Sequence, residues 1–346
     1  GISKEQLSED GEPCILYGEL YTKYKSEIIK QVESKTDIDC SKLKRSKAND
    51  VIIPCSGETA VDIATARCVP FDNILLGGDL NIISLHKYDG AFMSYQLNGK
   101  RKYDIARVAQ GVSVVHLYGE HLKAIKTYNP SLPEQQKIAK LLSLIDERIA
   151  TQNKIIEDLK KLKSAIRKKI FSLLKDEYTK SFEINQLLDY EQPTAYIVAN
   201  DEYSTDTRLT PVLTANKGFI LGYTDEKNGI YQKGACIIFD DFTMDAKYVS
   251  FPFKVKSSAI KILTAKPNVN LRFMFEYLSH WELKSEEHKR HYISEISPLV
   301  IELPSKEKQN IIALLMTSLN NKLTIEEKAK IRYEVQKGYL LSQMFI

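Results

Sequence analysis

The chain has 346 residues, of which 43% are hydrophobic and 27% charged, as expected of a globular protein with two domains of ordinary size. No apolar stretch reaches the roughly 20 residues that a membrane-spanning helix needs, and no signal-peptide pattern is present. Five cysteines without a Cys-x-x-Cys pair argue against a disulfide framework and a zinc ribbon, so we expect a cytoplasmic protein. The net charge of +4 indicates nucleic-acid binding only weakly, since an ordinary basic protein would carry it too.

The first domain is predicted to cover residues 1–130. Short apolar runs separated by glycine-rich and polar turns are typical of strands in a mixed α/β domain. The predicted strands are 51–54, 74–76, 80–84 and 112–117.

Residues 131–176 are predicted to form one long helix. Pro133 lies in the first turn, where a missing N–H costs nothing, and Glu134 complements the positive end of the helix dipole. Apolar residues recur at spacings of three, four and seven, which is the pattern of a coiled-coil seam. The seam positions are Ile145, Ile149, Ile156, Leu159, Leu162 and Ile166. About forty residues at 1.5 Å each make a rod of roughly 60 Å, and its apolar face needs a partner.

A second domain over residues 177–302 leads into a second long helix over residues 303–346. The predicted strands are 211–213, 219–221, 236–239 and 259–263, followed by a helix over 270–283. The second long helix carries a weaker apolar stripe, consisting of Leu319, Leu323, Ile331, Val335, Tyr339 and Phe345. Antiparallel packing of the two long helices would place the two domains at opposite ends.

The two halves of the chain resemble each other. Gln136, Ile138, Leu141 and Leu142 align with Gln309, Ile311, Leu314 and Leu315; after a one-residue insertion, Ile145, Arg148, Ile149, Lys163 and Phe171 align with Leu319, Lys322, Leu323, Lys337 and Phe345. We therefore expect an α+β fold: two mixed α/β domains separated by two long antiparallel helices that form a coiled coil, with an internal pseudo-twofold repeat. Pro13 corresponds to Pro211, but fewer residues precede it, which indicates a first domain shortened at its start, as in a fragment.

The motif that begins with Leu132-Pro133-Glu134-Gln135-Gln136-Lys137-Ile138-Ala139 and continues through Leu141 to Ile149 and Leu159 to Phe171 resembles the central conserved region of DNA-specificity (S) subunits of type I restriction–modification systems. The segment from Leu303 to Phe345 resembles the distal conserved region. It departs from the pattern at Leu319-Asn320, in place of Ile-Asp, and at Gly338, which costs a helix up to about 1 kcal/mol. Segments 110–122 and 291–300 resemble parts of target recognition domains. The resemblance covers nearly the whole chain.

The resemblance implies a non-catalytic subunit in which each globular domain reads one half of a bipartite site on double-stranded DNA. Because the two domains have diverged, that site should be asymmetric. The long helices would set the spacing and dock two methyltransferase (M) subunits, and restriction (R) subunits would join through the complex. S-adenosylmethionine, ATP and Mg would belong to those partners, with no cofactor in this chain. Two alternatives remain: a single-chain restriction or methylation enzyme, and a structural coiled-coil spacer.

Catalytic and metal-binding motifs are weak. Asn129-Pro130-Ser131-Leu132 lacks the second proline and the aromatic ring that would hold a flipped adenine, and no phosphate-binding loop occurs. Asp240 and Asp241 could hold a divalent ion, but a polar loop at a strand end explains them better. His288 and His291 have no cysteine nearby in sequence. We therefore predict no catalytic residue and no metal site.

Candidate DNA contacts follow from residue type and loop position. Lys and Arg can hold phosphates, while Gln, Asn, Glu and Asp can pair with base edges. The candidates in the first domain are Tyr17, Thr22, Lys23, Tyr24, Ser56, Glu58, Thr59 and Gln110. Those in the second domain are Tyr196, Thr214, Asn216, Lys217, Asp241, Thr243, Lys247, Tyr248, Arg290 and Tyr292. A purely structural role explains each of them about equally well.

Overall fold

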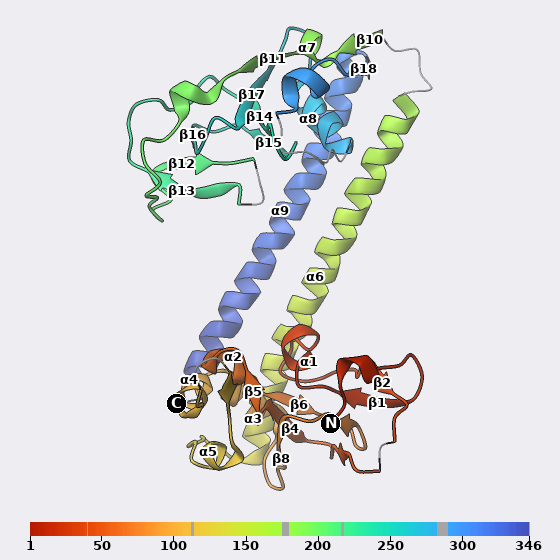
Figure 1. The fold of residues 1–346 in the computed structure, drawn as a ribbon, viewed down its shortest axis with the longest axis vertical. Coiled ribbons are helices and arrows are strands. Elements are labelled where there is room, and N and C mark those ends of the chain that lie inside the picture. Colours follow the sequence, from red (N-terminus) through yellow and green to blue (C-terminus); the bar gives the residue numbers. More distant parts are fainter. Residues whose placement is uncertain (40, 112–113, 175–179, 216–217, 282–289, 346) are drawn as a thin grey trace. The chain divides into compact units, whose positions relative to one another are not determined.

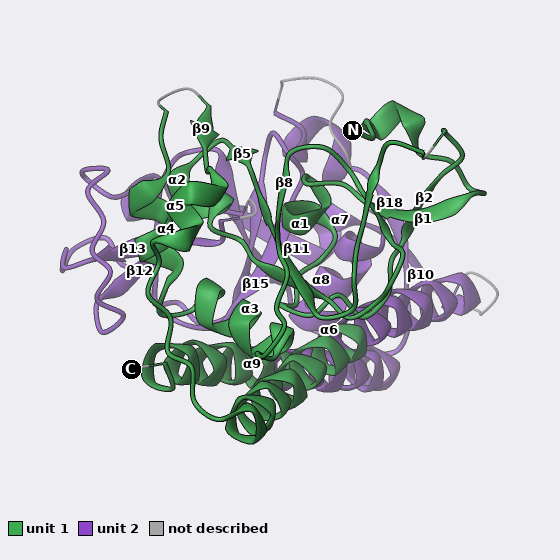
Figure 2. Ribbon diagram, turned by 90° about the horizontal axis from the view of Figure 1, so that it is seen from below, with its two compact units in different colours: residues 1–155, 326–346 green, residues 156–325 purple. Residues whose placement is uncertain are grey.

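The computed structural model of the chain describes residues 1–39, 41–111, 114–174, 180–215, 218–281 and 290–345. It contains two long helices, α6 (Leu132–Leu174) and α9 (Lys306–Gln343), together with globular parts that mix short strands and short helices (Figure 1). The chain divides into two compact units (Figure 2): unit 1 comprises residues 1–155 and 326–346, and unit 2 comprises residues 156–325. Each long helix therefore contributes one half to each unit. The predicted mixed α/β class, the two domains and the long helices are confirmed.

Unit 1 is built mainly from short strands. Its strands are β1 (Glu12–Ile15), β2 (Ser34–Thr36), β3 (Lys44–Arg45), β4 (Asp50–Pro54), β5 (Ser56–Gly57), β6 (Arg67–Val69), β7 (Leu75–Leu76), β8 (Leu80–Ile83) and β9 (Val115–His116). Its short helices are η1 (Lys4–Gln6), α1 (Glu19–Thr22), α2 (Ala60–Ile63), α3 (Gly90–Asn98), α4 (Lys102–Val108) and α5 (Gly119–Lys123). The strands predicted at 51–54, 74–76 and 80–84 correspond to β4, β7 and β8. Residues 112 and 113 of the fourth predicted strand lie outside the described residues.

Unit 2 has a similar composition. Its strands are β10 (Lys180–Glu183), β11 (Leu188–Glu191), β12 (Thr210–Leu213), β13 (Ile220–Thr224), β14 (Cys236–Asp240), β15 (Ala246–Val249), β16 (Lys254–Val255), β17 (Ile260–Ala265) and β18 (Val300–Leu303). Its short helices are α7 (Ile184–Leu187), η2 (Pro193–Tyr196), α8 (Leu271–His280) and the π-helical turn η3 (Tyr292–Ile296). The predicted strands and the predicted helix over 270–283 correspond to β12, β13, β14, β17 and α8.

Six strands of each unit pair in the same order, although β7 also pairs with β3 and β17 also pairs with β11. In unit 1, β1 pairs antiparallel with β2 and parallel with β7, and β4 lies between β6 and β8 with antiparallel pairing on both sides. In unit 2, β12 pairs antiparallel with β13 and parallel with β16, and β14 lies between β15 and β17 with the same antiparallel pairing. Pro13 and Pro211 are the second residues of the equivalent strands β1 and β12. The central strands β4 and β14 are buried along their whole length, as their continuous apolar sequences require.

One glutamine near the start of α6 ties this helix to the globular part of unit 1. The Gln135 side chain accepts a hydrogen bond from the backbone N–H of Asp89 at 2.9 Å and donates one to the carbonyl oxygen of Pro130 at 2.8 Å. Asp89 is the N-cap of α3, and its own carboxylate accepts from the backbone N–H of Phe92 at 2.7 Å. A single buried amide thus joins the starts of two helices.

The same arrangement occurs near the start of α9 in unit 2. Gln309 accepts from the backbone N–H of Asn270, the N-cap of α8, at 2.8 Å and donates to the carbonyl oxygen of Pro304 at 2.9 Å. The counterpart of Gln309 is therefore Gln135, and the sequence alignment with Gln136 is wrong by one residue. Gln136 is exposed, because only one of two consecutive helical residues can face the globular part.

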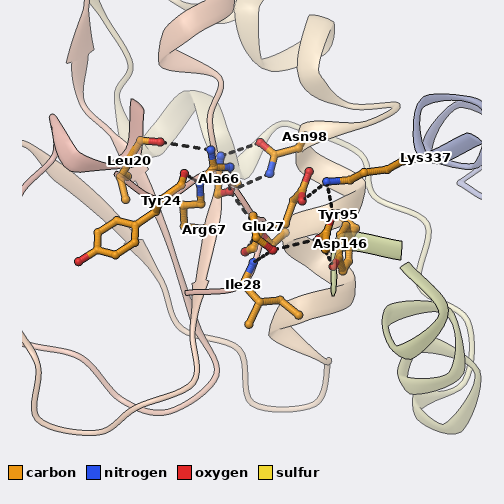
Figure 3. A network of polar contacts seen from close by, with 12 residues as sticks. Leu20, Tyr24, Glu27, Ile28, Ala66, Arg67, Tyr95, Asn98, Asp146 and Lys337 are labelled. Atoms are coloured by element: carbon orange, nitrogen blue, oxygen red, sulfur yellow. Dashed lines mark hydrogen bonds and ion pairs between the residues drawn. The ribbon is translucent and has the colours of Figure 1, made fainter. Parts of the chain in front are cut away.

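A buried ion cluster attaches both long helices to unit 1 (Figure 3). The ammonium of Lys337 on α9 lies 2.5 Å from the carboxylate of Glu27 and 2.7 Å from that of Asp146 on α6. The hydroxyl of Tyr95 on α3 donates to Asp146 at 2.6 Å. Although burial would lower the pKa of Lys337, the carboxylates of Glu27 and Asp146 raise it, so Lys337 remains charged. Since Gln152 of α6 also donates to the Glu326 carbonyl oxygen at 3.2 Å, the two helices run antiparallel in this unit.

The buried faces of the long helices recur every three or four residues. On α6 the shielded positions include Leu142, Ile145, Ile149, Gln152, Ile156, Leu159, Lys163, Ile166 and Ile170; on α9 they include Ile312, Met316, Leu319, Leu323, Glu326, Lys330, Tyr333, Lys337, Leu340 and Met344. Seven predicted seam residues lie on these buried faces: Ile145, Ile149, Ile156, Leu159, Ile166, Leu319 and Leu323.

Four predicted seam and stripe residues are wrong. Leu162 is 49% exposed, Ile331 57%, Val335 66% and Tyr339 65%. Each lies one or two positions away from the buried face, which passes instead through the polar residues Lys163 and Lys337. The prediction followed apolar side chains, whereas polar groups occupy these buried positions.

The burial difference along α6 gives a direct test of its packing. Ile156 is 7% exposed and Leu162 49% exposed on the same helix. We expect Ile156→Asp to lower the free energy of unfolding by about 3 kcal/mol or more, because it buries an unpaired charge. Leu162→Asp should change it by less than about 0.5 kcal/mol. Urea unfolding followed by circular dichroism measures both, and equal losses in the two variants would contradict the packing described.

The ion cluster gives a second test. We expect Lys337→Met to lower the free energy of unfolding by about 3–5 kcal/mol, because Glu27 and Asp146 would stay buried without their cation. Lys330→Met is the control on the same helix, since Lys330 is half-buried and pairs with Glu334 at 3.6 Å, and such a partly exposed pair contributes at most about 1 kcal/mol. Thermal and urea unfolding measure both variants. A loss at Lys337 no larger than that at Lys330 would show that the cluster is not stabilising.

Candidate nucleic-acid interface

Unit 1 contains a pocket of about 520 Å³ on the side of α1. Its lining residues come from the loop before α1, from α1 itself, from the β5 turn, from α2 and from the segment before β9: Tyr17, Gly18, Tyr21, Thr22, Ser56, Gly57, Glu58, Asp62 and Val114. Tyr17, Thr22, Ser56 and Glu58 were predicted from the sequence as DNA contacts, and the structure brings these four together.

Short-range interactions hold the walls of this pocket. The hydroxyl of Tyr21 donates to the carbonyl oxygen of Ser56 at 3.3 Å, so α1 and the β5 turn stay adjacent. A Cβ added at Gly57 would lie 3.2 Å from that hydroxyl, and this close approach explains the glycine. Thr59 is the N-cap of α2 and accepts from the backbone N–H of Asp62 at 3.1 Å, which fixes the first turn of α2, and Asp62 of this turn lines the pocket.

The pocket is acidic. Burial, followed by the nearby charges of Asp62 and Asp79, raises the pKa of Tyr21, so its phenol stays protonated and can donate. The Asp62 carboxylate accepts from the Thr59 hydroxyl at 2.6 Å, and the Asp79 carboxylate accepts from the Ser56 hydroxyl. Three lining residues, Tyr21, Asp62 and Val114, were not predicted from the sequence. Tyr21 lies four residues after Tyr17, and Asp62 completes a Thr-x-x-Asp cap, so both could have been found from spacing.

The other candidates of the first domain lie outside this pocket. Lys23 is exposed and pairs with Glu19 at 2.7 Å, and Gln110 is exposed with its backbone bonded to that of His116. Thr59 acts as the cap described above. The prediction for Tyr24 is wrong: its ring is buried in the core with Ile15, where its apolar surface is removed from water.

Three candidates of the second domain are wrong for the same reason, since Tyr196, Asp241 and Tyr292 are buried. Tyr196 packs in the core of unit 2 and its hydroxyl donates to Glu191 at 2.7 Å. Tyr292 packs against Phe239 with ring centroids 5.5 Å apart. These tyrosines beside polar loops therefore belong to the core of unit 2 and not to its surface.

Asp241 has a structural role. Its carboxylate pairs with the ammonium of Lys261 at 3.2 Å, with both side chains 1% exposed, and accepts from the backbone N–H of Tyr292 at 2.7 Å. Its backbone carbonyl accepts from the N–H of His291 at 2.9 Å. Asp241 thereby anchors the start of η3 to the end of β14, and its carboxylate is not available to DNA.

The remaining candidates of unit 2 are wholly or partly accessible but do not form one site. Thr243 and Arg290 are exposed, and Thr214 and Lys247 are half-buried. Tyr248 on β15 is covered by the guanidinium of Arg272, 4.4 Å from the ring centroid. Asn216 and Lys217 lie outside the described residues.

Among the residues that the structure describes, no group of three or more His, Cys, Asp and Glu side chains is arranged to hold a metal ion. None of the helices there is long and apolar enough to cross a membrane.

Known proteins provide a family and a fold for this chain. The sequence model of the type I restriction modification DNA specificity domain matches residues 19–161 and 176–335. The chain belongs to this family, whose members are specificity subunits without catalytic activity. The family match does not favour the single-chain enzyme or the spacer protein raised by the sequence.

Two relatives agree with this. The EcoR124I/EcoR124II type I restriction enzyme specificity subunit of Escherichia coli is 39% identical over 178 residues, which cover 46% of this chain and 43% of that protein. The putative type I restriction enzyme MjaX specificity subunit of Methanocaldococcus jannaschii is 25% identical over 251 residues, which cover 64% of this chain and 58% of that protein. The matched segments therefore span less than two thirds of either relative.

The fold is shared with a solved structure. The crystal structure of a type I restriction-modification system S subunit from M. genitalium superposes with a TM-score of 0.68 at 17% identity, covering 100% of this chain and 92% of that chain. At this identity the likeness establishes the fold alone.

Proposed function

We propose that this chain is the DNA sequence-recognition subunit of a type I restriction–modification complex. Each unit would read one half of a bipartite, asymmetric site on double-stranded DNA. The observation that carries the proposal is the repeated strand order, β1–β2–β4–β6–β7–β8 and β12–β13–β14–β15–β16–β17, in a member of a DNA-specificity family. Two copies of one scaffold with different surface residues suit two different half-sites.

The repeat extends to the aromatic contacts of the long helices. Phe345, just after α9, packs against Phe92 of α3 with ring centroids 5.3 Å apart, and Phe171 of α6 packs against Phe273 of α8 with ring centroids 5.8 Å apart. These pairs and the two glutamine contacts occupy matching places in their units. They support an internal duplication with pseudo-twofold symmetry.

The long helices would act as the spacer between half-sites. Their buried positions recur at alternating three- and four-residue steps, which supports an antiparallel coiled coil. A helix of 43 residues rises by about 65 Å, enough to span one to two turns of DNA at about 34 Å each.

The outer face of α9 supports a docking role. Ile331, Val335 and Tyr339 form an exposed apolar stripe in unit 1. The matching positions of α6 include Glu157 and Lys161, which form an exposed ion pair at 2.6 Å. The stripe on α9 is apolar and exposed, whereas charged residues occupy the matching positions on α6. An exposed apolar stripe of this kind suits binding to a methyltransferase subunit. The proposal also includes two M subunits, with R subunits joining through the complex. S-adenosylmethionine, ATP and Mg would belong to those partners, and the location would be cytoplasmic.

Methylation mapping tests the recognition function. Cells that carry this chain with its cognate methyltransferase should methylate adenine in a gapped, two-part, asymmetric motif, because two unlike units read the DNA. Long-read sequencing of the genome detects the modified bases. Cells with the methyltransferase alone provide the control, and either methylation in that control or a continuous motif would contradict the proposal.

A surface variant tests the docking role. Val335→Glu should weaken binding of the methyltransferase at least tenfold, because a charge would be buried in an apolar contact, while the fold remains intact at this exposed position. Gln336→Glu is the matched control, since it adds the same charge at the next exposed residue off the stripe. Isothermal titration calorimetry measures both affinities. Equal affinities would exclude this stripe as the docking surface.

A further inference from the structure

The pocket beside α1 in unit 1 has a chemistry opposite to that of a phosphate site. Glu58 and Asp62 lie in its wall, and no Lys or Arg occurs among the described residues that line it. Carboxylates repel a nearby phosphate group and accept hydrogen bonds from donors. The pocket therefore suits a ligand group that carries N–H.

Glu58 is the acceptor that remains available. Of the three carboxylates near the pocket, Asp62 already accepts from the Thr59 hydroxyl and Asp79 from the Ser56 hydroxyl. The side chain of Glu58 is exposed and makes no hydrogen bond or ion pair with any residue in the described ranges. It can take a new donor without breaking an existing contact.

The remaining walls suit contact with a base edge. Tyr17 and Val114 are both exposed and offer apolar surface beside Glu58. Tyr21 is fixed by its bond to Ser56, so its ring does not have to be ordered on binding. The ammonium of Lys25 donates to the carbonyl oxygen of Tyr21 at 2.8 Å and lies beside the wall, where a nucleic-acid backbone can meet it.

We infer that this pocket reads one base of the unit 1 half-site through its exocyclic amino group, with the Glu58 carboxylate as acceptor and Tyr17 beside the base edge. The amino groups that DNA presents in the major groove are N4 of cytosine and N6 of adenine, and a Glu carboxylate pairs with such a donor. The inference rests on the proposed DNA-reading function and makes it specific: Glu58 discriminates one base pair, whereas Lys25 contributes affinity without sequence.

The test removes the acceptor and the donor separately. The full chain, in complex with its cognate methyltransferase, binds duplexes that carry its mapped site. In each duplex one cytosine or adenine of the unit 1 half-site is replaced by an analogue that lacks the amino group, 2-pyrimidinone or purine. The dissociation constants of the wild-type complex and of the Glu58→Ala complex are measured on every duplex. The affected analogue tells cytosine from adenine.

We expect one analogue to weaken DNA binding by the wild-type complex about tenfold. The Glu58→Ala complex should bind the duplex with that analogue and the unmodified duplex with equal affinity. Glu120→Ala is the matched control: Glu120 is an exposed glutamate of unit 1 that pairs with Lys123 at 2.7 Å and does not line the pocket, so this variant should keep the wild-type penalty. If the wild-type complex binds an analogue duplex more weakly and the Glu58→Ala complex shows the same losses of affinity, this inference is overturned while the proposed function stands. A wild-type complex that binds all sequences alike would overturn the proposed function and this inference with it.

Discussion

Neither globular unit completes its core without both long helices. In unit 1, Leu142 of α6 and Phe345 after α9 lie in one buried cluster with Phe92. In unit 2, Phe171 of α6 and Met316 of α9 lie in one buried cluster with Phe273. Aromatic side chains of this size bury enough apolar area to dominate the packing of a small domain. The scaffold is therefore maintained by contacts between residues far apart in the sequence.

Polar contacts determine which helix segments fit each unit. Lys337 needs Glu27 and Asp146 in unit 1. In unit 2, Glu276 is fully buried and accepts from Arg167 of α6 at 2.7 Å and from Asn320 of α9 at 3.3 Å. The charged partners therefore differ between the units, although Gln135 and Gln309 make matching contacts to the backbone of an N-cap residue. Since an unpaired buried charge is costly, each segment is favoured in its own place.

The sequence predicted the long helices well because a three- and four-residue period over some forty positions is a strong local signal. It misplaced Ile331 and Val335, because the buried face of α9 changes from apolar to polar after Leu323 and the apolar pattern no longer marks it. Helix α3 was not predicted, since nearly all of its residues are buried and no amphipathic period remains. Tyr24, Tyr196 and Tyr292 show the corresponding limit for the site: a tyrosine beside a polar turn can be core or surface, and only the tertiary fold decides.

The division of the chain into a continuous unit 2 and a discontinuous unit 1 has a consequence for its synthesis. Ribosomes release a polypeptide from its N-terminus onward, and domains generally fold as units as they emerge. Unit 2 can close once residue 325 has emerged, whereas unit 1 still lacks Lys337 and Phe345 at that moment. The part made first is thus finished last, and until then Glu27 and Phe92 have no partner from α9 and are exposed to chaperones and proteases.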